Sequence, residues 1–282
     1  MNNKIKFRKS ETFYLRDGWI EKAINSIKGN EDIFSKNNGI SILGIGSNMV
    51  KGLKYWLQAA NIIDVSNSIT TLTDFGELLL KYDKYIESNF SLFLIHYNLV
   101  TNKIECPLFY GLFNSDIKSF TKNDFIEKMM TYYKDYDVNK DYIDDDTKIL
   151  LKSYINENNG DNPEDNYVCP LSNLKLLEKK GDKYKKTRPF YRNLSYLIIY
   201  YCLGKQYNYS QFNIEESYDE VNSPMNLFNL DKNMYLQYLD EMKKHKLILI
   251  NKTAGLNTVY FEKEKELDLE EIFDKYFGKE NK

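Results

Sequence analysis

A polar and basic stripe runs along one side of a predicted helix in the stretch LGIGSNMVKGLKYWLQAANII, residues 43–63. Its members recur at i, i+4, i+7 and i+11 and are Ser47, Lys51, Lys54 and Gln58. On a helix this spacing places them all on one face. Ammonium groups neutralise phosphates, and hydroxyl and amide groups can hydrogen-bond to base edges. The stripe therefore has the chemistry of a helix that contacts DNA.

Apolar residues occupy the opposite side of the same segment, as in a helix that packs on a core. They recur at i, i+3, i+7 and i+10 and are Val50, Leu53, Leu57 and Ala60. Gly44 and Gly46 allow a tight turn before the helix, and Ser47 stands where an N-cap is expected. A core helix whose polar side is only solvated is the competing interpretation.

Residues beside the stripe extend the candidate DNA-binding set. Asn48 could reach a base edge, and helix capping is an equally valid role for it. For Gln58 the equally valid alternative to base contact is simple exposure to solvent. Tyr55 follows Lys54 and supports the helix, whereas Trp56 is expected in the core.

Basic residues before the first predicted helix form an N-terminal arm that could neutralise phosphates: Lys4, Lys6, Arg8 and Lys9. Each such contact steepens the salt dependence of binding. We count Arg8 and Lys9 among the DNA-binding residues. Arg16 is a further candidate for phosphate contact, and a salt bridge with Asp17 or Glu21 is the equally valid alternative.

The elements predicted around the stripe follow the order of a winged helix-turn-helix. A helix capped by Asp17 precedes a short helix over residues 31–41 and the glycine turn. After the striped helix come two β segments around an Asn/Ser turn, and then a helix from Asp74. Residues 1–85 are therefore predicted to form a winged helix-turn-helix DNA-binding domain. Many winged helices, however, bind only protein.

Residues 86–185 are predicted to form a mixed helical middle domain with an acidic segment. FSLFLIHYNLV is apolar enough for a buried strand or a helix, and KNDFIEKMMTYY reads as a helix capped by Thr121. DYIDDDTKILLKSYI has helical spacing from Asp144, ENNGDNPED is turn-rich, and KKGDKYKKTR predicts a basic turn or hairpin.

Residues 186–282 repeat the order of the N-terminal domain and are predicted to be winged-helix-like. PFYRNLSYLIIYYCLG supplies a first helix, MNLFNLDKNMYLQYLDEMKKHKLI a short second and a longer third, and LILINKTAGLNTVYFE a hairpin. Charges of both signs on the third helix favour protein interaction or dimerisation over groove entry. The fold class is thus mainly α with small β wings, α+β.

Charge is unevenly distributed along the chain, although the formal net charge is only −2. Residues 1–60 have a balance of +5, residues 135–165 of −7 and residues 175–192 of +6. Any nucleic-acid surface must therefore be local rather than global. A solvated surface remains the alternative for each charged run.

Catalytic and metal-binding patterns are not found in the sequence. There is no CxxC, no phosphate-binding glycine loop and no GxSxG, and Cys169 reads as a packing thiol. His96 lies in an apolar run and is expected to be a hydrogen-bonded core residue. The run 144–146 favours capping and solvation over a metal site, because consecutive helical side chains diverge. We expect no enzyme activity, metal or cofactor, and keep a divalent-metal nuclease as a third hypothesis.

Cysteine usage and hydropathy bear on the compartment. Three widely spaced cysteines without a signal peptide indicate a reducing cytoplasm. No apolar run reaches the ~18 residues of a membrane span. We therefore expect a cytoplasmic protein without a membrane partner.

Five stretches resemble a prokaryotic family that is catalogued only as a domain of unknown function. They are SETFYLRDGWIEK, LGIGSNMVKGLKYWLQAANII, LTDFGELLLKYDKYIES, SLFLIHYNLV and CPLSNLKLL. Family members carry patterns close to ETFxLRxGW and LGVGxNMV, and the GIGSNMVKGLKYW block is specific. The conservative Ile45 and Leu53 are minor departures.

The resemblance implies a genomic context. Genes of the family often lie beside genes of DNA phosphorothioation and restriction, including a sulfate-reductase-like enzyme and ATPases. It implies an accessory or regulatory role in phage defence and no known activity. Our first hypothesis is a DNA-binding subunit of such a system that contacts duplex DNA through the N-terminal winged helix. The alternative is an adaptor that does not bind DNA and holds a modification or restriction complex together, with those proteins or a second protomer as partners.

Overall fold

The chain divides into two units, residues 1–112 with 116–187 and residues 113–115 with 188–282. The computed structural model describes residues 5–35, 38–156, 167–253, 256–262 and 266–280. Over these ranges helices combine with small antiparallel sheets, which confirms the α+β class. The expected division at 185/186 lies close to the one at 187/188, whereas the expected division at 85/86 lies inside the first unit.

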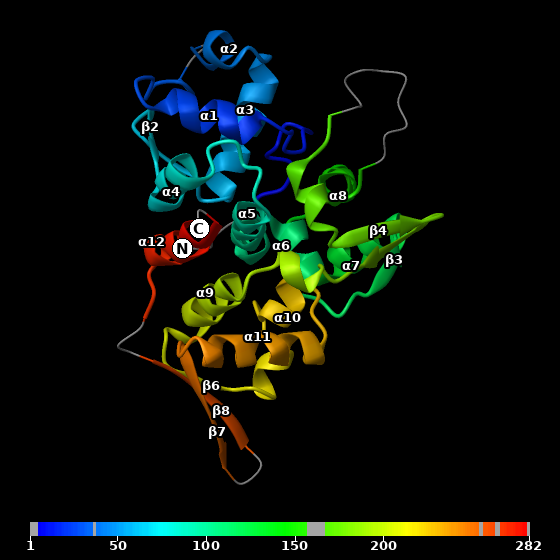
Figure 1. The fold of residues 1–282 in the computed structure, drawn as a ribbon. Coiled ribbons are helices and arrows are strands. Elements are labelled where there is room, and N and C mark those ends of the chain that lie inside the picture. The colour runs from blue at the N-terminus through cyan, green and yellow to red at the C-terminus, as the bar shows by residue number, and fades with distance from the viewer. Residues whose placement is uncertain (1–4, 36–37, 157–166, 254–255, 263–265, 281–282) are drawn as a thin grey trace. The chain divides into compact units, whose positions relative to one another are not determined.

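The first unit begins with the predicted order of elements (Figure 1). These elements are α1 (Trp19–Ile27), α2 (Asn38–Leu43), α3 (Ser47–Ala59), β1 (Ile63–Ser66), β2 (Ile69–Leu72) and α4 (Asp74–Tyr82). Strands β1 and β2 form an antiparallel hairpin in which Ile63 pairs with Leu72. The backbone N–H of Thr70 donates to Glu31 O at 2.7 Å, so the hairpin is tied to the chain between α1 and α2. Whether this arrangement is a winged helix-turn-helix stays a prediction.

Helix α3 buries the predicted apolar stripe, including Val50, Leu53 and Leu57, together with Trp56. Two expected caps differ in the structure. The N-cap of α1 is Gly18 rather than Asp17, because the backbone there has a φ of 74° that glycine adopts without strain. Helix α3 starts at Ser47 after the N-cap Gly46, and no side chain caps it.

The remainder of the first unit is built around the buried helix α5 (Asn89–Thr101), in which His96 accepts or donates a 2.6 Å hydrogen bond with Tyr154. It also contains α7 (Lys122–Tyr132), α8 (Lys140–Tyr154) and most of α6 (Pro107–Phe113). The sheet order is β3-β5-β4, from Ser119–Thr121, Lys183–Lys186 and Leu177–Lys180, and a 3-10 turn over Pro170–Leu174 precedes β4.

The second unit contains the predicted helices and hairpin, with two additions. Its helices are α9 (Tyr196–Tyr207), α10 (Pro224–Leu227), α11 (Lys232–Lys244) and α12 (Leu269–Glu280). Strands β6 (Gln211–Asn213), β8 (Leu256–Phe261) and β7 (Ile248–Thr253) form an antiparallel sheet in that order. Short 3-10 turns cover Tyr191–Asn193 and Glu216–Tyr218. Strand β6 and α12 were not predicted.

Several sequence predictions can be compared directly with these elements. The helix expected over 31–41 is observed over Asn38–Leu43, and the run FSLFLIHYNLV, residues 90–100, lies in helix α5 rather than in a strand. Thr121 caps α7, as predicted, and it does so in a capping box with Asp124 that was not predicted. Cys169 is a buried free thiol, as expected for a packing residue. Helix α8 starts at Lys140, before the expected Asp144, because the side chain of Asn139 caps it. The stretch ENNGDNPED lies outside the described residues.

Over the described residues, no helix has the length and apolar character needed to cross a membrane.

Gly76 in α4 provides a test of this packing. A Cβ at this position would lie 2.2 Å from Ile62 O, a backbone atom that cannot move independently. We expect Gly76→Ala to lower the free energy of unfolding by about 1–3 kcal/mol, despite the higher helix propensity of alanine. Gly278→Ala in α12 is the matched control, since no atom lies within 4 Å of a Cβ there. The control should be stabilised by about 0.5–1 kcal/mol. Equal shifts of the thermal unfolding midpoint in both variants would contradict this account.

Candidate nucleic-acid interface

The N-terminal arm, residues 5–16, crosses α3 in close contact. A Cβ at Gly52 would lie 2.8 Å from Ser10 O, so only glycine allows the arm to approach the helix this closely. The indole Nε1–H of Trp56 donates to Phe13 O at 2.9 Å. The arm is therefore packed against α3 and does not extend freely from the domain.

The acidic run of α8 holds the arm in place. The backbone N–H of Arg8 donates to Asp146 Oδ2 at 2.8 Å, and Arg8 Nε lies 3.4 Å from Asp145 Oδ2. The guanidinium carbon of Arg8 lies 5.4 Å from the ring centre of Tyr142. The predicted DNA contact Arg8 is thus engaged by α8, and its side chain does not line the cavity described below.

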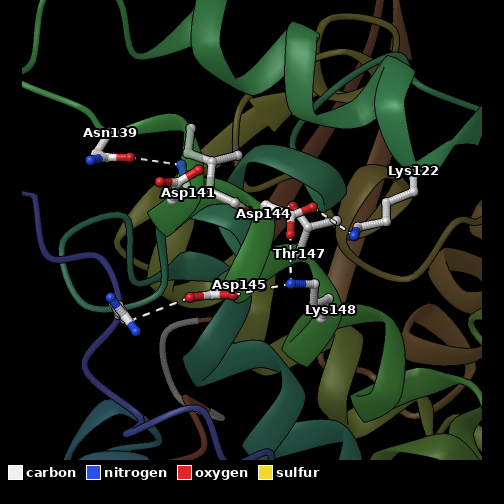
Figure 2. A network of polar contacts seen from close by, with 9 residues as sticks. Lys122, Asn139, Asp141, Asp144, Asp145, Thr147 and Lys148 are labelled. Atoms are coloured by element: carbon white, nitrogen blue, oxygen red, sulfur yellow. Dashed lines mark hydrogen bonds and ion pairs between the residues drawn. The ribbon is translucent and has the colours of Figure 1, made fainter.

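Asp144 and Asp145 form ion pairs within the same region (Figure 2). Asp144 lies 2.6 Å from both Lys122 Nζ and Lys148 Nζ, and Asp145 lies 3.1 Å from Lys148 Nζ. The two lysines lower the pKa of Asp144 through these bonds. Capping and solvation, the roles expected for this run, therefore describe it incompletely. Asn139 supplies the cap, and the run provides structural ion pairs and the anchor of the arm.

A second anchor fixes the start of the arm. The backbone N–H of Lys6 donates to Ile104 O at 2.9 Å, and Lys6 Nζ forms an ion pair with Glu105. The hydroxyl of Tyr55 in α3 donates to Glu105 O at 2.5 Å and lies 3.4 Å from Cys106 Sγ. Burial, and then the neighbouring Cys106, raises the pKa of Tyr55, so it remains a neutral donor. The chain near residue 105 thereby joins the arm to α3.

A cavity of about 670 Å³ opens between the arm, α3 and the β1-β2 hairpin. Its lining combines four lysines with neutral polar groups and two carboxylates: Lys6, Lys9, Lys51, Lys54, Tyr55, Gln58, Asn61, Ile63, Asp64, Thr73 and Glu105. The stripe predicted on α3 and the predicted basic arm therefore meet at one place. A concave surface lined by cations attracts anions from solution.

Three of these lysines lack a carboxylate partner among the described residues. In the described part of the chain, no ion pair joins Lys9, Lys51 or Lys54 to an acidic side chain. The nearest contact of Lys51 is a long one, 3.5 Å from its Nζ to Asn48 Oδ1. Four lysines outnumber the two carboxylates of the lining, Asp64 and Glu105, and Glu105 is already paired with Lys6. The local charge of the cavity is therefore positive.

The remaining predicted residues lie at different places. Ser47, Asn48 and Gln58 are exposed on α3, but of these only Gln58 lines the cavity. Asn61, Asp64, Thr73 and Glu105 line it and were not predicted. Their contribution depends on the tertiary fold, because no local pattern marks Glu105 as a neighbour of α3.

Arg16 forms neither salt bridge expected for it among the residues that the structure describes, and its phosphate contact stays a prediction. It is 8% exposed, and its guanidinium carbon lies 4.5, 5.4 and 5.6 Å from the ring centres of Tyr167, Phe13 and Trp19. No described ion pair joins it to Asp17 or Glu21. In this structure the cation packs among aromatic rings and lies outside the cavity lining.

A protein-family model and two crystal structures each match nearly the whole chain. A family model described as "Protein of unknown function (DUF4007)" matches residues 7–277. A crystal structure of magnesium ion-bound SspB superposes with a TM-score of 0.81 at 22% identity and covers 91% of this chain and 83% of that chain. A further SspB crystal structure gives a TM-score of 0.79 at 20% identity, covering 98% and 94%. These structures share the fold of the chain. No curated protein matches it.

The anchor of the arm predicts a pH dependence. Burial raises the pKa of Asp146 to about 7, even though the hydrogen bond from Arg8 lowers it. An unfolded aspartate has a pKa of about 3.9, so between about pH 4 and pH 7 the folded chain binds more protons than the unfolded chain. The free energy of unfolding must therefore fall as the pH rises through this window.

Asp146→Asn keeps an acceptor for the Arg8 N–H but does not titrate. We expect the variant to lose less stability than the parent chain when the pH is raised from about 5 to about 8. Denaturant unfolding at both pH values measures the difference. An identical pH dependence in the two proteins would show that Asp146 does not titrate in this range.

Proposed function

We propose that this chain, which belongs to the family of proteins of unknown function DUF4007, binds duplex DNA through the basic cavity beside α3. The observation that carries the proposal is the convergence of Lys6, Lys9, Lys51 and Lys54, from two segments distant in sequence, on one cavity. Lysines neutralise phosphates as point charges, and release of condensed counterions then favours binding.

The position of α3 supports the duplex as the ligand. It is the third helix of an order that, in winged helix-turn-helix proteins, places one helix in the major groove and a hairpin beside it. The exposed Ser47, Asn48 and Gln58 lie on α3 with the lysines, where they would reach base edges if the helix entered the groove. Phosphate contacts would come from the lysines and would fix the orientation of the protein.

A role in DNA phosphorothioation or restriction follows as the wider part of the proposal. It rests on the resemblance of GIGSNMVKGLKYW and its companion stretches to a family encoded near such genes. In that setting the chain is an accessory or regulatory subunit that brings modification or restriction proteins to DNA. The proposed protein partners are a sulfate-reductase-like enzyme, an ATPase or a second protomer.

Magnesium-dependent DNA cleavage is a second candidate function, favoured by the similarity to a magnesium ion-bound SspB structure. Mg²⁺ is often held by one or two carboxylates together with substrate phosphates. Asp64 and Glu105 line the basic cavity, although Glu105 is paired with Lys6. Among the described residues, no group of three or more His, Cys, Asp or Glu side chains is suited to hold a metal ion. Any metal in the cavity would therefore take further ligands from DNA phosphates or water.

The first test replaces both cavity lysines of α3. Lys51→Ala with Lys54→Ala should weaken binding to random duplex DNA, measured by fluorescence anisotropy at several salt concentrations. The slope of log K against log salt should become shallower by about 2, since each lost phosphate contact contributes about 0.9. The fold should be retained, because neither side chain is buried.

Lys243→Ala with Lys244→Ala is the matched control, because these exposed lysines of α11 belong to the second unit. It changes the net charge equally and should leave the slope unchanged. Failure of the parent chain to bind duplex DNA at low salt would contradict the proposal. Capture of a modification or restriction protein by the same preparation would then support the adaptor alternative.

The cleavage candidate has its own test on supercoiled plasmid DNA with and without Mg²⁺. It predicts nicked or linear product only with the metal, and loss of this product in Asp64→Asn while DNA binding remains. Asp240→Asn, an exposed carboxylate of α11, is the control. Unchanged supercoiled DNA with both Mg²⁺ and Mn²⁺ would remove this candidate.

A further inference from the structure

The basic hairpin β4-β5 belongs to a sheet with two chemically different faces. Strand β5 lies in the centre and pairs with β3 on one side and β4 on the other. Directly paired residues point to the same face of a sheet, and successive residues alternate between faces. The pairs Lys179–Tyr184 and Phe120–Tyr184 therefore share one face, and the pairs Lys180–Lys183 and Glu178–Lys185 share the other.

The first of these faces is packed against α7. The rings of Phe120 and Tyr184 stack with centres 5.7 Å apart, and Phe120 lies 5.2 Å from the ring of Phe125 in α7. Figure 1 shows β3 and β4 next to α7 in the first unit. This face supplies the apolar contacts that hold the sheet on the domain.

The opposite face is open and cationic. Lys180, Lys183 and Lys185 are exposed on it, and the side chains of Lys180 and Lys185 are 75% and 58% exposed. Glu178 contacts two of these lysines, 3.3 Å from Lys180 Nζ and 3.7 Å from Lys185 Nζ. Lys183 has no described ion pair, and Asp124 near it is bonded into the cap of α7 with Thr121.

Protection of a sheet edge explains only part of this pattern. Lysines on edge strands prevent pairing with other chains, which accounts for Lys180 on the edge strand β4. Lys183 and Lys185 lie on the central strand β5, whose two edges are already paired. In addition, Lys180 and Lys183 are directly opposite each other, and like charges in such pairs destabilise a hairpin. A polyanion bound to this face would relieve that repulsion.

We infer that the face formed by Lys180, Lys183 and Lys185, which we call the hairpin face, is a second contact for the phosphate backbone of duplex DNA. The inference rests on the proposed function, since it assigns a further surface to the same ligand. The three lysines act as point charges on a flexible stem, which suits phosphates rather than base edges. The hairpin face therefore increases affinity and salt dependence without adding sequence preference.

Opposite changes on this face test the inference in the full chain. The triple hairpin variant replaces Lys180, Lys183 and Lys185 with alanine. Its affinity for a random duplex of about 40 base pairs should fall about tenfold or more near physiological salt. The salt slope should become shallower by about 2 to 3. In Glu178→Gln, which frees two lysines from their carboxylate, affinity should rise about two- to threefold. A gain of binding cannot result from misfolding.

The control replaces three exposed lysines of the second unit, Lys243, Lys244 and Lys252, with alanine and should leave both quantities unchanged. The Lys51→Ala with Lys54→Ala variant, run in parallel, separates the two surfaces. If it weakens binding but the triple hairpin variant and Glu178→Gln bind like the parent chain, the hairpin inference is wrong and the proposed function stands. If the parent chain does not bind duplex DNA, both are wrong.

Discussion

The passage of the N-terminal arm across α3 is the constraint on which the candidate interface depends. The arm approaches so closely that Gly52 has no room for a side chain beside Ser10 O, and the Trp56 indole bonds to Phe13 O. These contacts place the lysines of the arm beside those of α3. Without them the two sets of cations would be independent, and α3 would have only a stripe. The basic cavity is therefore a product of backbone packing as well as of charge.

Carboxylates of the acidic segment hold the N-terminal arm in this arrangement. A chain with a net charge of −2 presents a cationic cavity because most of its carboxylates lie outside the cavity lining. In α8, Asp144 is engaged by Lys122 and Lys148, and Asp145 and Asp146 hold Arg8. Arg8 thus holds the arm against α8, whereas Lys9 and the lysines of α3 have no described carboxylate partner. The ion pairs, more than the composition, show which cations stabilise the fold and which lack a carboxylate partner in the described residues and so can bind an anion.

The sequence predicts the features that depend on local periodicity and turn chemistry. The two stripes of α3, the hairpin after it and the cap at Thr121 all follow from spacing and residue type. It does not predict features that depend on contacts distant in sequence. The run at 90–100 is a helix buried on most of its sides, so its apolar pattern carries no period that distinguishes a helix from a strand. Likewise, the role of Asp146 depends on a backbone N–H 138 positions away.

The central claim is that the cavity lysines without a described carboxylate partner, Lys9, Lys51 and Lys54, contact DNA phosphates, and lysine modification tests it most directly. The chain would be treated with an amine-acetylating reagent with and without duplex DNA, and modification at each lysine would be quantified by mass spectrometry. We predict that DNA protects Lys9, Lys51 and Lys54, and that Lys243 and Lys244 are modified equally in both samples. Equal modification of the cavity lysines with and without saturating DNA would contradict the account.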